Sequence, residues 1–160
     1  AAKTVQHFWY NVDFTRGGGA LAKVKEDKAP EPKVVVKGNQ TIVDLAAIPH
    51  QLKYNLTNFS VKAGSKVKIT FLNPDVIPHN LLIVEPGSKA EIGNQAIAMG
   101  AEAVKKAPTN SKILHGTKML EAGQKETLEF NAPSKPGDYE FICTFPGHWA
   151  VMNGIMKVTQ

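Results

Sequence analysis

Cysteine and arginine are almost missing from this chain of 160 residues, because Cys143 and Arg16 are the only residues of their types. A lone cysteine cannot form a disulfide within the chain, so the cysteine content does not indicate whether the protein works in an oxidising or a reducing compartment. The other cationic side chains are lysines, which are scattered along the sequence and contribute to a net charge of +5. Base recognition and bidentate phosphate binding rely on arginine, so nucleic acid is disfavoured as a partner. A diffuse lysine field favours acidic partners instead.

The sequence also lacks long apolar runs and a recognisable targeting segment. No stretch approaches the roughly 20 apolar residues that cross a bilayer, so no transmembrane segment is expected. The chain begins AAKTVQ, without a methionine or a signal peptide, which suggests a processed mature protein or a trimmed one. Its length suits a single domain with a core of its own.

The first 33 residues differ in composition from the rest. Residues 7–14 read HFWYNVDF and are rich in aromatic side chains, whereas residues 23–33 read KVKEDKAPEPK, a charged and proline-bearing stretch. The glycines at 17–19 are not followed by the Gly-Lys-Ser/Thr of a phosphate-binding loop. We therefore predict residues 1–33 as an N-terminal extension. Its aromatic side chains are expected to pack on the main domain or on another chain, which would give self-association.

Residues 34–160 carry the pattern of a β-sheet domain. In residues 65–73 the apolar Val67, Ile69 and Phe71 alternate with polar residues, which is typical of a strand with one buried face. Glycine- and proline-containing turns, including one at residues 38–40, separate the apolar runs. The pattern predicts further strands over 33–37, 79–85, 125–132, 137–145 and 154–160. Strands of this number and spacing indicate an all-β fold, a two-sheet antiparallel sandwich.

Residues 89–108 are the exception to this β pattern. Apolar residues from Ile92 to Val104 recur near helical spacing, and Pro108 ends the segment. Gly93 and Gly100 weaken the helical tendency, because glycine is a poor helix former. We predict one helix or a helix pair inserted in the β domain.

Three metal-binding side chains lie in one short loop, which reads FICTFPGHWAVMNG over residues 141–154. Cys143 ends a strand, Pro146 and Gly147 turn the chain, and His148 and Met152 follow. His79 lies at the start of another predicted strand and is the histidine best placed to join them. A thiolate, two imidazoles and a weak axial thioether match a type 1 (blue) copper site.

The sequence resembles the cupredoxin family of copper proteins. CTFPGHWAVM is similar to the ligand loop of azurin and auracyanin, and PHNLLIV is similar to the plastocyanin segment around its first histidine. The resemblance covers residues 34–160 and implies a cupredoxin-type Greek-key β-sandwich with a short helical insert. It also implies one copper ion held by His79, Cys143, His148 and Met152, and single-electron transport by Cu(I)/Cu(II) cycling without enzymatic activity.

The resemblance further implies roles for residues beside the ligands. Asn80 matches the family position that ties the two ligand segments together and donates to the cysteine sulfur. Phe145 keeps a backbone N–H that offers the sulfur a second donor, and Thr144 is assigned to the same surroundings of the metal. Pro78 stands where azurin has a glycine whose carbonyl lies near the metal, so a four-coordinate site is expected.

Partners and location also follow from the resemblance. An apolar patch of Phe145, Pro146 and Trp149 around His148 is expected to dock redox partner proteins such as a cytochrome or an oxidase, and the lysines would attract acidic ones. Cupredoxins usually work outside the cytoplasm, so a bacterial periplasm or cell surface is expected.

Three other functions would use some of the same residues. A Cys-His nucleophilic enzyme built on Cys143 and His148 gives no role to His79 or Met152. A structural zinc site would not choose a thioether as its fourth ligand. A copper carrier or copper sensor on the same fold is the alternative, although carriers generally keep their ligands exposed and these ligands are expected to be recessed.

Overall fold

The computed structural model describes residues 28–160, so the arm prediction for residues 1–33 lies almost entirely outside the described residues. The elements follow one another as β1 (Lys33–Lys37), β2 (Gln40–Ala46), β3 (Asn58–Lys62), β4 (Lys66–Leu72), β5 (Leu82–Val84), the helix α2 (Lys89–Ala98), the 3₁₀-helix η1 (Gly100–Val104), β6 (Ile113–Gly116), β7 (Lys125–Asn131), β8 (Gly137–Ile142), the 3₁₀-helix η2 (His148–Ala150) and β9 (Asn153–Thr159). Among the described residues, no helix has the length and apolar character needed to cross a membrane.

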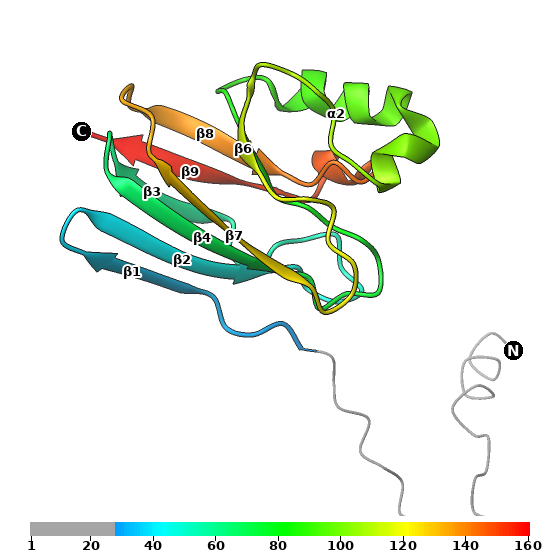
Figure 1. Ribbon diagram of the computed structural model, residues 1–160, viewed down its shortest axis with the longest axis horizontal. Helices are drawn as coiled ribbons and strands as arrows, with labels where there is room; N and C mark the ends of the chain where they lie inside the picture. Colours follow the sequence, from blue (N-terminus) through cyan, green and yellow to red (C-terminus); the bar gives the residue numbers. More distant parts are fainter. Residues whose placement is uncertain (1–27) are drawn as a thin grey trace, which may run out of the picture.

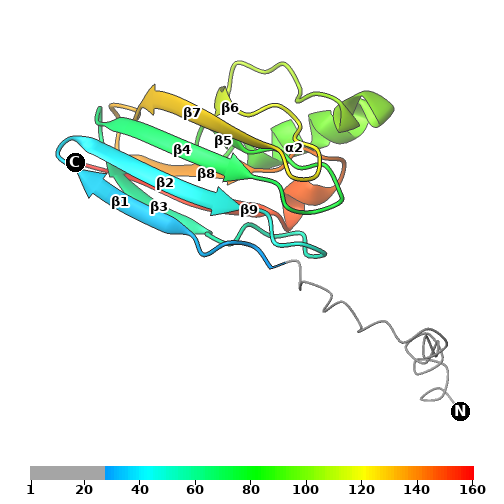
Figure 2. The same ribbon diagram turned by 60° about the horizontal axis from the view of Figure 1, so that its bottom comes forward.

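The strands form two sheets packed face to face, as Figures 1 and 2 show. One sheet has the order β1-β2-β4-β7, and the other has the order β3-β9-β8-β5-β6. The predicted β-sandwich is confirmed, but the prediction that it is antiparallel is wrong, because β2 pairs with β4 and β3 pairs with β9 in parallel. The reason is the chain path. Since β3 runs back in the opposite sheet, β4 starts at the same end of the sandwich as β2.

β4 buries the residues that its alternation assigned to the interior. Val67, Ile69 and Phe71 on β4 are buried, and so are Phe141 on β8 and Met156 on β9. Burial of a large apolar side chain contributes about 1.5–3 kcal/mol. The core therefore fixes the two sheets that carry the metal-binding loops at their shared end.

Three strands were not predicted individually: β2, β3 and β6. The turn expected at residues 38–40 is shorter than expected, and β2 begins at Gln40. β6 is a four-residue edge strand whose register with β5 is irregular between Ile83 and Val84, so it has no clean alternation to detect.

The helical insert is confirmed as α2 followed by η1. Ile92 of α2 packs with Leu82, Val84 and Ile142, which form a second, smaller apolar cluster on the outer face of the β5 sheet. The indole ring of Trp149 packs against the same cluster. The helix therefore packs between the sheet and η2, the short helix that contains His148.

Gly93 is buried in α2 because the indole ring of Trp149 lies directly on it. The sequence suggested only that this glycine weakens the helix. The structure shows that it makes room for the loop that carries His148, since a methyl group here would overlap atoms of the indole ring.

Replacing Gly93 with alanine should lower the free energy of unfolding by about 1 kcal/mol. Helix propensity alone would stabilise the variant by about 0.8–1 kcal/mol, but overpacking costs about 1–3 kcal/mol. Chemical denaturation measures the difference, and the exposed Asn94→Ala in the same helix is the control, expected to be neutral or slightly stabilising. A stabilised Gly93→Ala protein would contradict this account of the contact.

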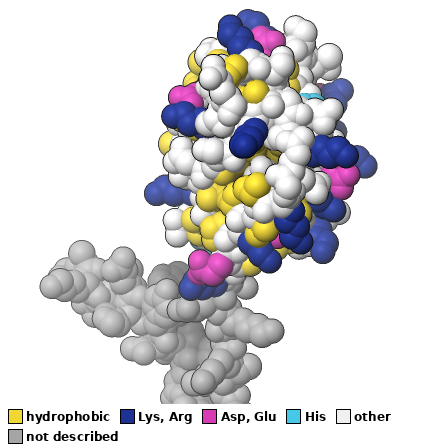
Figure 3. Space-filling view, turned by 90° about the vertical axis from the view of Figure 1, so that its left-hand side faces the viewer, with side chains coloured by type: hydrophobic (Ala, Val, Ile, Leu, Met, Phe, Trp, Pro, Cys, Tyr) yellow, Lys and Arg dark blue, Asp and Glu magenta, His cyan; other side chains and the backbone are white. Residues whose placement is uncertain are grey.

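Lysine side chains are spread over the face of the molecule seen in Figure 3 and form no single stripe there. Figure 3 faces the end of the sandwich that carries the C-terminus, and shows lysines distributed around apolar side chains. This distribution agrees with the diffuse positive field expected from the sequence.

Candidate metal centre

The structure brings together His79, Cys143 and His148, three of the four predicted ligands. One donor atom of each lies within 4.8 Å of the others, and all three side chains are buried. Within residues 28–160 this is the one such group of histidine, cysteine and acidic side chains. It lies where β8 ends and β9 begins, at the end of the sandwich opposite the β1–β2 turn. Two segments that lie far apart in the sequence therefore meet at one end of the sandwich.

The donor atoms have the spacing that a single metal ion requires. The Cys143 Sγ lies 3.7 Å from Nδ1 of His79 and 3.7 Å from Nδ1 of His148. Donors placed about 2.1 Å from one ion in a common plane lie about 3.6 Å from one another. One thiolate and two imidazoles suit copper in both of its oxidation states. Both the chemistry and the spacing of the donor set therefore fit one copper ion.

The loop from Cys143 to Met152 is closed by its own backbone hydrogen bonds. Gly147 adopts a φ of 81°, which favours glycine, and turns the chain so that the His148 N–H donates to the Phe145 carbonyl. The Met152 N–H donates to the His148 carbonyl at 2.7 Å, and the Cys143 N–H donates to the Met152 carbonyl at 3.1 Å. Met152 is fully buried beside Cys143 in the main core. Its role as axial ligand stays a prediction.

His79 is held by a second loop, residues 73–79, that leads from β4 towards β5. Its backbone forms an isolated bridge with Leu120, in which each residue's N–H donates to the other's carbonyl. The buried Asn73 amide donates to the carbonyls of Ile77 and Leu120 at 2.9 and 2.8 Å. The position of His79 therefore depends on backbone contacts made well away from its own segment.

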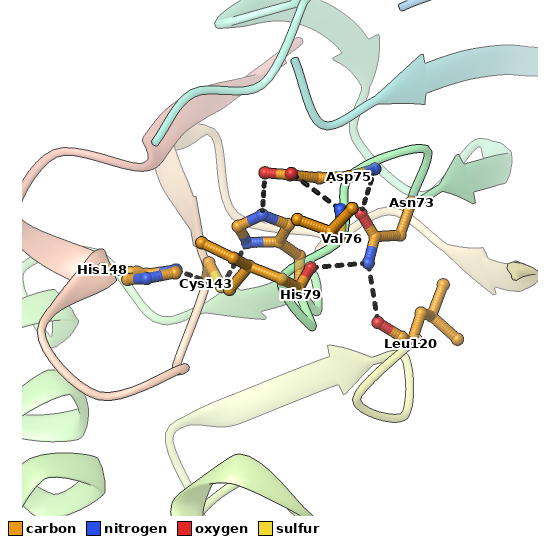
Figure 4. A network of polar contacts seen from close by, with 8 residues as sticks. Asn73, Asp75, Val76, His79, Leu120, Cys143 and His148 are labelled. Carbon is orange, nitrogen blue, oxygen red and sulfur yellow. Dashed lines mark hydrogen bonds and ion pairs between the residues drawn. The ribbon is translucent and has the colours of Figure 1, made fainter. Parts of the chain in front are cut away.

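Asp75 is a residue of this site that the sequence did not single out. Its side chain is 1% exposed, and its Oδ2 lies 3.1 Å from Nε2 of His79 (Figure 4). Burial raises the pKa of this carboxyl, but hydrogen bonds from His79 and from the backbone N–H groups of His50 and Val76 outweigh it, and the pKa lies below its ordinary value. A carboxylate four residues before a histidine is too common a pattern to mark such a pair.

Asn80 ties the two ligand loops together. Its side-chain amide donates to Oγ1 of Thr144 at 2.8 Å, and its Oδ1 accepts the Thr144 N–H at 2.7 Å. Tyr54 adds a third support, because its buried hydroxyl donates to the Asn80 carbonyl at 2.6 Å. These contacts match the tie between the ligand segments that the resemblance implied for Asn80, and they give Thr144 a concrete part in it.

Burial shifts the pKa values of two of the predicted ligands, Cys143 and His148. Burial raises the pKa of the Cys143 thiol to about 11, while backbone N–H groups of Asn80 and Phe145 favour the thiolate and oppose the rise. Burial, assisted by the nearby His79 and opposed by Asp75, lowers the pKa of His148 to about 4. His148 is therefore neutral at physiological pH and ready to bind a metal. Metal binding must in turn displace the thiol proton.

Comparison with known proteins agrees with this chemistry. The profile described as "Copper binding proteins, plastocyanin/azurin family" matches residues 41–159, which include every predicted ligand. The chain belongs to this family.

Individual relatives support the assignment. The chain is 35% identical over 122 residues to auracyanin-B of Chloroflexus aurantiacus, covering 73% of this chain and 52% of auracyanin-B. It is 26% identical over 138 residues to azurin of Pseudomonas aeruginosa, covering 81% and 86% of the two chains. The crystal structure of dithionite-reduced auracyanin from Roseiflexus castenholzii superimposes with a TM-score of 0.68 at 34% identity, covering 78% of this chain and all of that one. The cupredoxin fold and a single type 1 copper as cofactor are thereby confirmed.

The surface around His148 is formed by apolar side chains from both of the loops that hold the ligands. Phe145 and Pro146 are partly exposed, and the Phe145 ring lies 4.5 Å from the imidazole of His148, centroid to centroid. Trp149 is partly exposed too, but its indole ring packs against α2. Val76 and Val151, which the sequence did not suggest, are 70% and 57% exposed and belong to the two loops that hold the ligands.

Two other histidines of the described chain, His50 and His115, lie outside the ligand group. His50 is exposed, and His115 is partly buried and stacks on Phe130 with ring centroids 4.1 Å apart. His7 lies outside the described residues.

Proposed function

We propose that this cupredoxin carries single electrons between redox partner proteins and holds its copper through His79, Cys143, His148 and Met152. The observation that carries the proposal is the buried group of one sulfur and two imidazole nitrogens at the end of a rigid sandwich. When bound, copper supplies the Cu(I)/Cu(II) couple. The chain holds the donors in fixed positions through the Asn80–Thr144 pair and the closed ligand loop, which limits rearrangement between the two states.

Burial of the donors favours an electron carrier over the alternative, a copper carrier or sensor. His79 and Cys143 are fully buried, and His148 is 6% exposed. A metal delivered to another protein must leave through exposed, exchangeable ligands, whereas an electron needs only a short path to the surface. His148, whose imidazole lies beside the partly exposed ring of Phe145, offers that path. The proposal requires no substrate and no enzymatic reaction.

The partners we propose are redox proteins that dock on the apolar surface of Phe145, Pro146 and Trp149. The exposed Val76 and Val151 enlarge this surface. Small apolar interfaces suit short-lived complexes, and the net charge of +5 would speed the encounter with an acidic cytochrome or oxidase. We also propose that the protein works outside the cytoplasm, for example in a bacterial periplasm. Self-association through residues 1–33 is part of the same proposal.

The visible absorption spectrum of the purified protein with added Cu(II) tests the function. Charge transfer from the Cys143 thiolate should give an intense blue colour. A colourless protein, or one that prefers Zn²⁺ in competition, would contradict the proposal.

The Met152→Ala variant tests the axial ligand. We expect its absorption maximum and its reduction potential to shift, because the axial ligand tunes both properties. Met156→Ala is the matched control, since Met156 is equally buried but belongs to the core of β9. Each substitution should cost about 2–5 kcal/mol of stability. Equal spectra for the two variants would rule out a bond between Met152 and the metal.

A further inference from the structure

Asp75 is a buried carboxylate in direct contact with a metal ligand. Its Oδ2 pairs with Nε2 of His79 at 3.1 Å, and its Oδ1 accepts the Val76 N–H at 2.7 Å (Figure 4). The backbone N–H of His50 lies close enough to this carboxylate to lower its pKa. At 1% exposure the side chain has little access to water. The carboxylate is thus held by contacts on both of its oxygens, and it pairs with Nε2 of His79, whereas Nδ1 of the same ring lies beside Cys143.

We propose that Asp75 is a positioning residue for the copper site, which sets the tautomer of His79 and lowers the reduction potential of the metal. This inference rests on the proposed function, because it concerns the same copper. Two consequences of the contact carry it, one geometric and one electrostatic.

The geometric consequence concerns the two ring nitrogens of His79. A carboxylate at Nε2 accepts a hydrogen bond, so the hydrogen of the neutral ring resides on Nε2. The lone pair is then on Nδ1, the nitrogen that lies 3.7 Å from the Cys143 sulfur. A carboxylate in this place also makes the imidazole a stronger donor to the metal and holds the plane of its ring.

The electrostatic consequence concerns the charge of the copper. Cu(II) carries one more positive charge than Cu(I), so a fixed anion nearby stabilises Cu(II) more than Cu(I). Asp75 is separated from the metal position by only one imidazole ring, and it lies in a buried region where charges interact more strongly than in water. Its negative charge should therefore lower the reduction potential.

The neighbouring loop is shaped to hold the carboxylate in place. His50 has a φ of 60°, which is uncommon for a residue other than glycine, and its backbone N–H lowers the pKa of the neighbouring Asp75 carboxyl. Within the His79 loop, the Asp75 N–H donates to Oδ1 of Asn73 at 3.0 Å. A strained residue that persists beside a functional group is consistent with a positioning role.

Cyclic voltammetry of copper-loaded Asp75→Asn tests the inference. The variant should favour Cu(I) by about tenfold at a fixed potential, a rise of about 59 mV for one electron. Asp138→Asn is the matched control, because it removes one exposed carboxylate at the opposite end of β8 and should leave the potential unchanged. Asp75→Glu, which restores the charge, should return towards the wild-type value. A blue Asp75→Asn protein with the wild-type potential would overturn the inference.

A measurement on the wild-type protein covers the case in which Asp75→Asn does not fold. Nitrogen-15 NMR of the Cu(I) form should show a hydrogen on Nε2 of His79 that exchanges slowly with water. An Nε2 that carries no hydrogen, or one whose hydrogen exchanges freely with water, would overturn the inference. The wild-type visible spectrum separates the two proposals: a colourless wild type refutes the copper function, whereas a blue wild type with either negative result refutes only the role of Asp75.

Discussion

Replacing Cys143 with serine should abolish the intense visible absorption of the copper-loaded protein. The colour comes from charge transfer out of a thiolate, and Cys143 is the only thiol in the chain. A serine hydroxyl is a poor ligand at neutral pH and offers no such transition. Loss of a residue that merely supports a ligand typically costs 10–100-fold in metal affinity, so loss of the thiolate itself should cost about 100-fold or more.

The visible spectrum and a competition titration with a Cu(I) chelator measure the two effects of Cys143→Ser. Ala150→Ser is the matched control, because it adds a hydroxyl at an exposed position of the same loop and should remain blue. Circular dichroism confirms that both variants are folded. If Cys143→Ser kept the colour and the affinity, the sulfur would not be a ligand and the copper site as described would be wrong.

The sequence was most informative where the chemistry is local. Cys143, His148 and Met152 lie within ten residues, and donor types at that spacing rarely occur together unless they bind a metal. His79 was found because it opens a buried strand, and the structure confirms that it lies next to Cys143. The short helix was found despite Gly93, since apolar residues still recur along its buried face.

The sequence was least informative where a role depends on contacts between distant segments. Asp75 is recognised as part of the site only when its carboxylate is seen against Nε2 of His79, with the backbone N–H of His50 from a distant segment nearby. Gly93 makes sense only when Trp149 is seen lying on it. Parallel pairing of β2 with β4 follows from the path of the chain through the opposite sheet, which alternation of apolar residues does not encode.

Gly154 should be a second position at which one added methyl group has a large effect. It lies on β9 directly opposite Phe141 of β8, two residues after Met152. A Cβ at Gly154 would overlap the Phe141 ring and lie 2.6 Å from the Thr57 carbonyl oxygen. That oxygen belongs to the backbone and accepts the Ile155 N–H at 2.8 Å, so it cannot move without loss of a hydrogen bond. Phe141 is fully buried and equally constrained.

Gly154→Ala should therefore lower the free energy of unfolding by about 3 kcal/mol, the upper part of the usual range for overpacking. Gly137→Ala is the matched control on β8, where the new Cβ would meet only Tyr139 and Pro86 at the ordinary distances of 3.7 and 3.9 Å. Its effect should stay within about 0.5 kcal/mol. Urea denaturation of both variants measures the difference. Because β9 begins at the ligand loop, a displaced strand should also shift the copper absorption of Gly154→Ala. Equal stability of the two variants would contradict this prediction, since it would show that Phe141 can move to make room for the added methyl group.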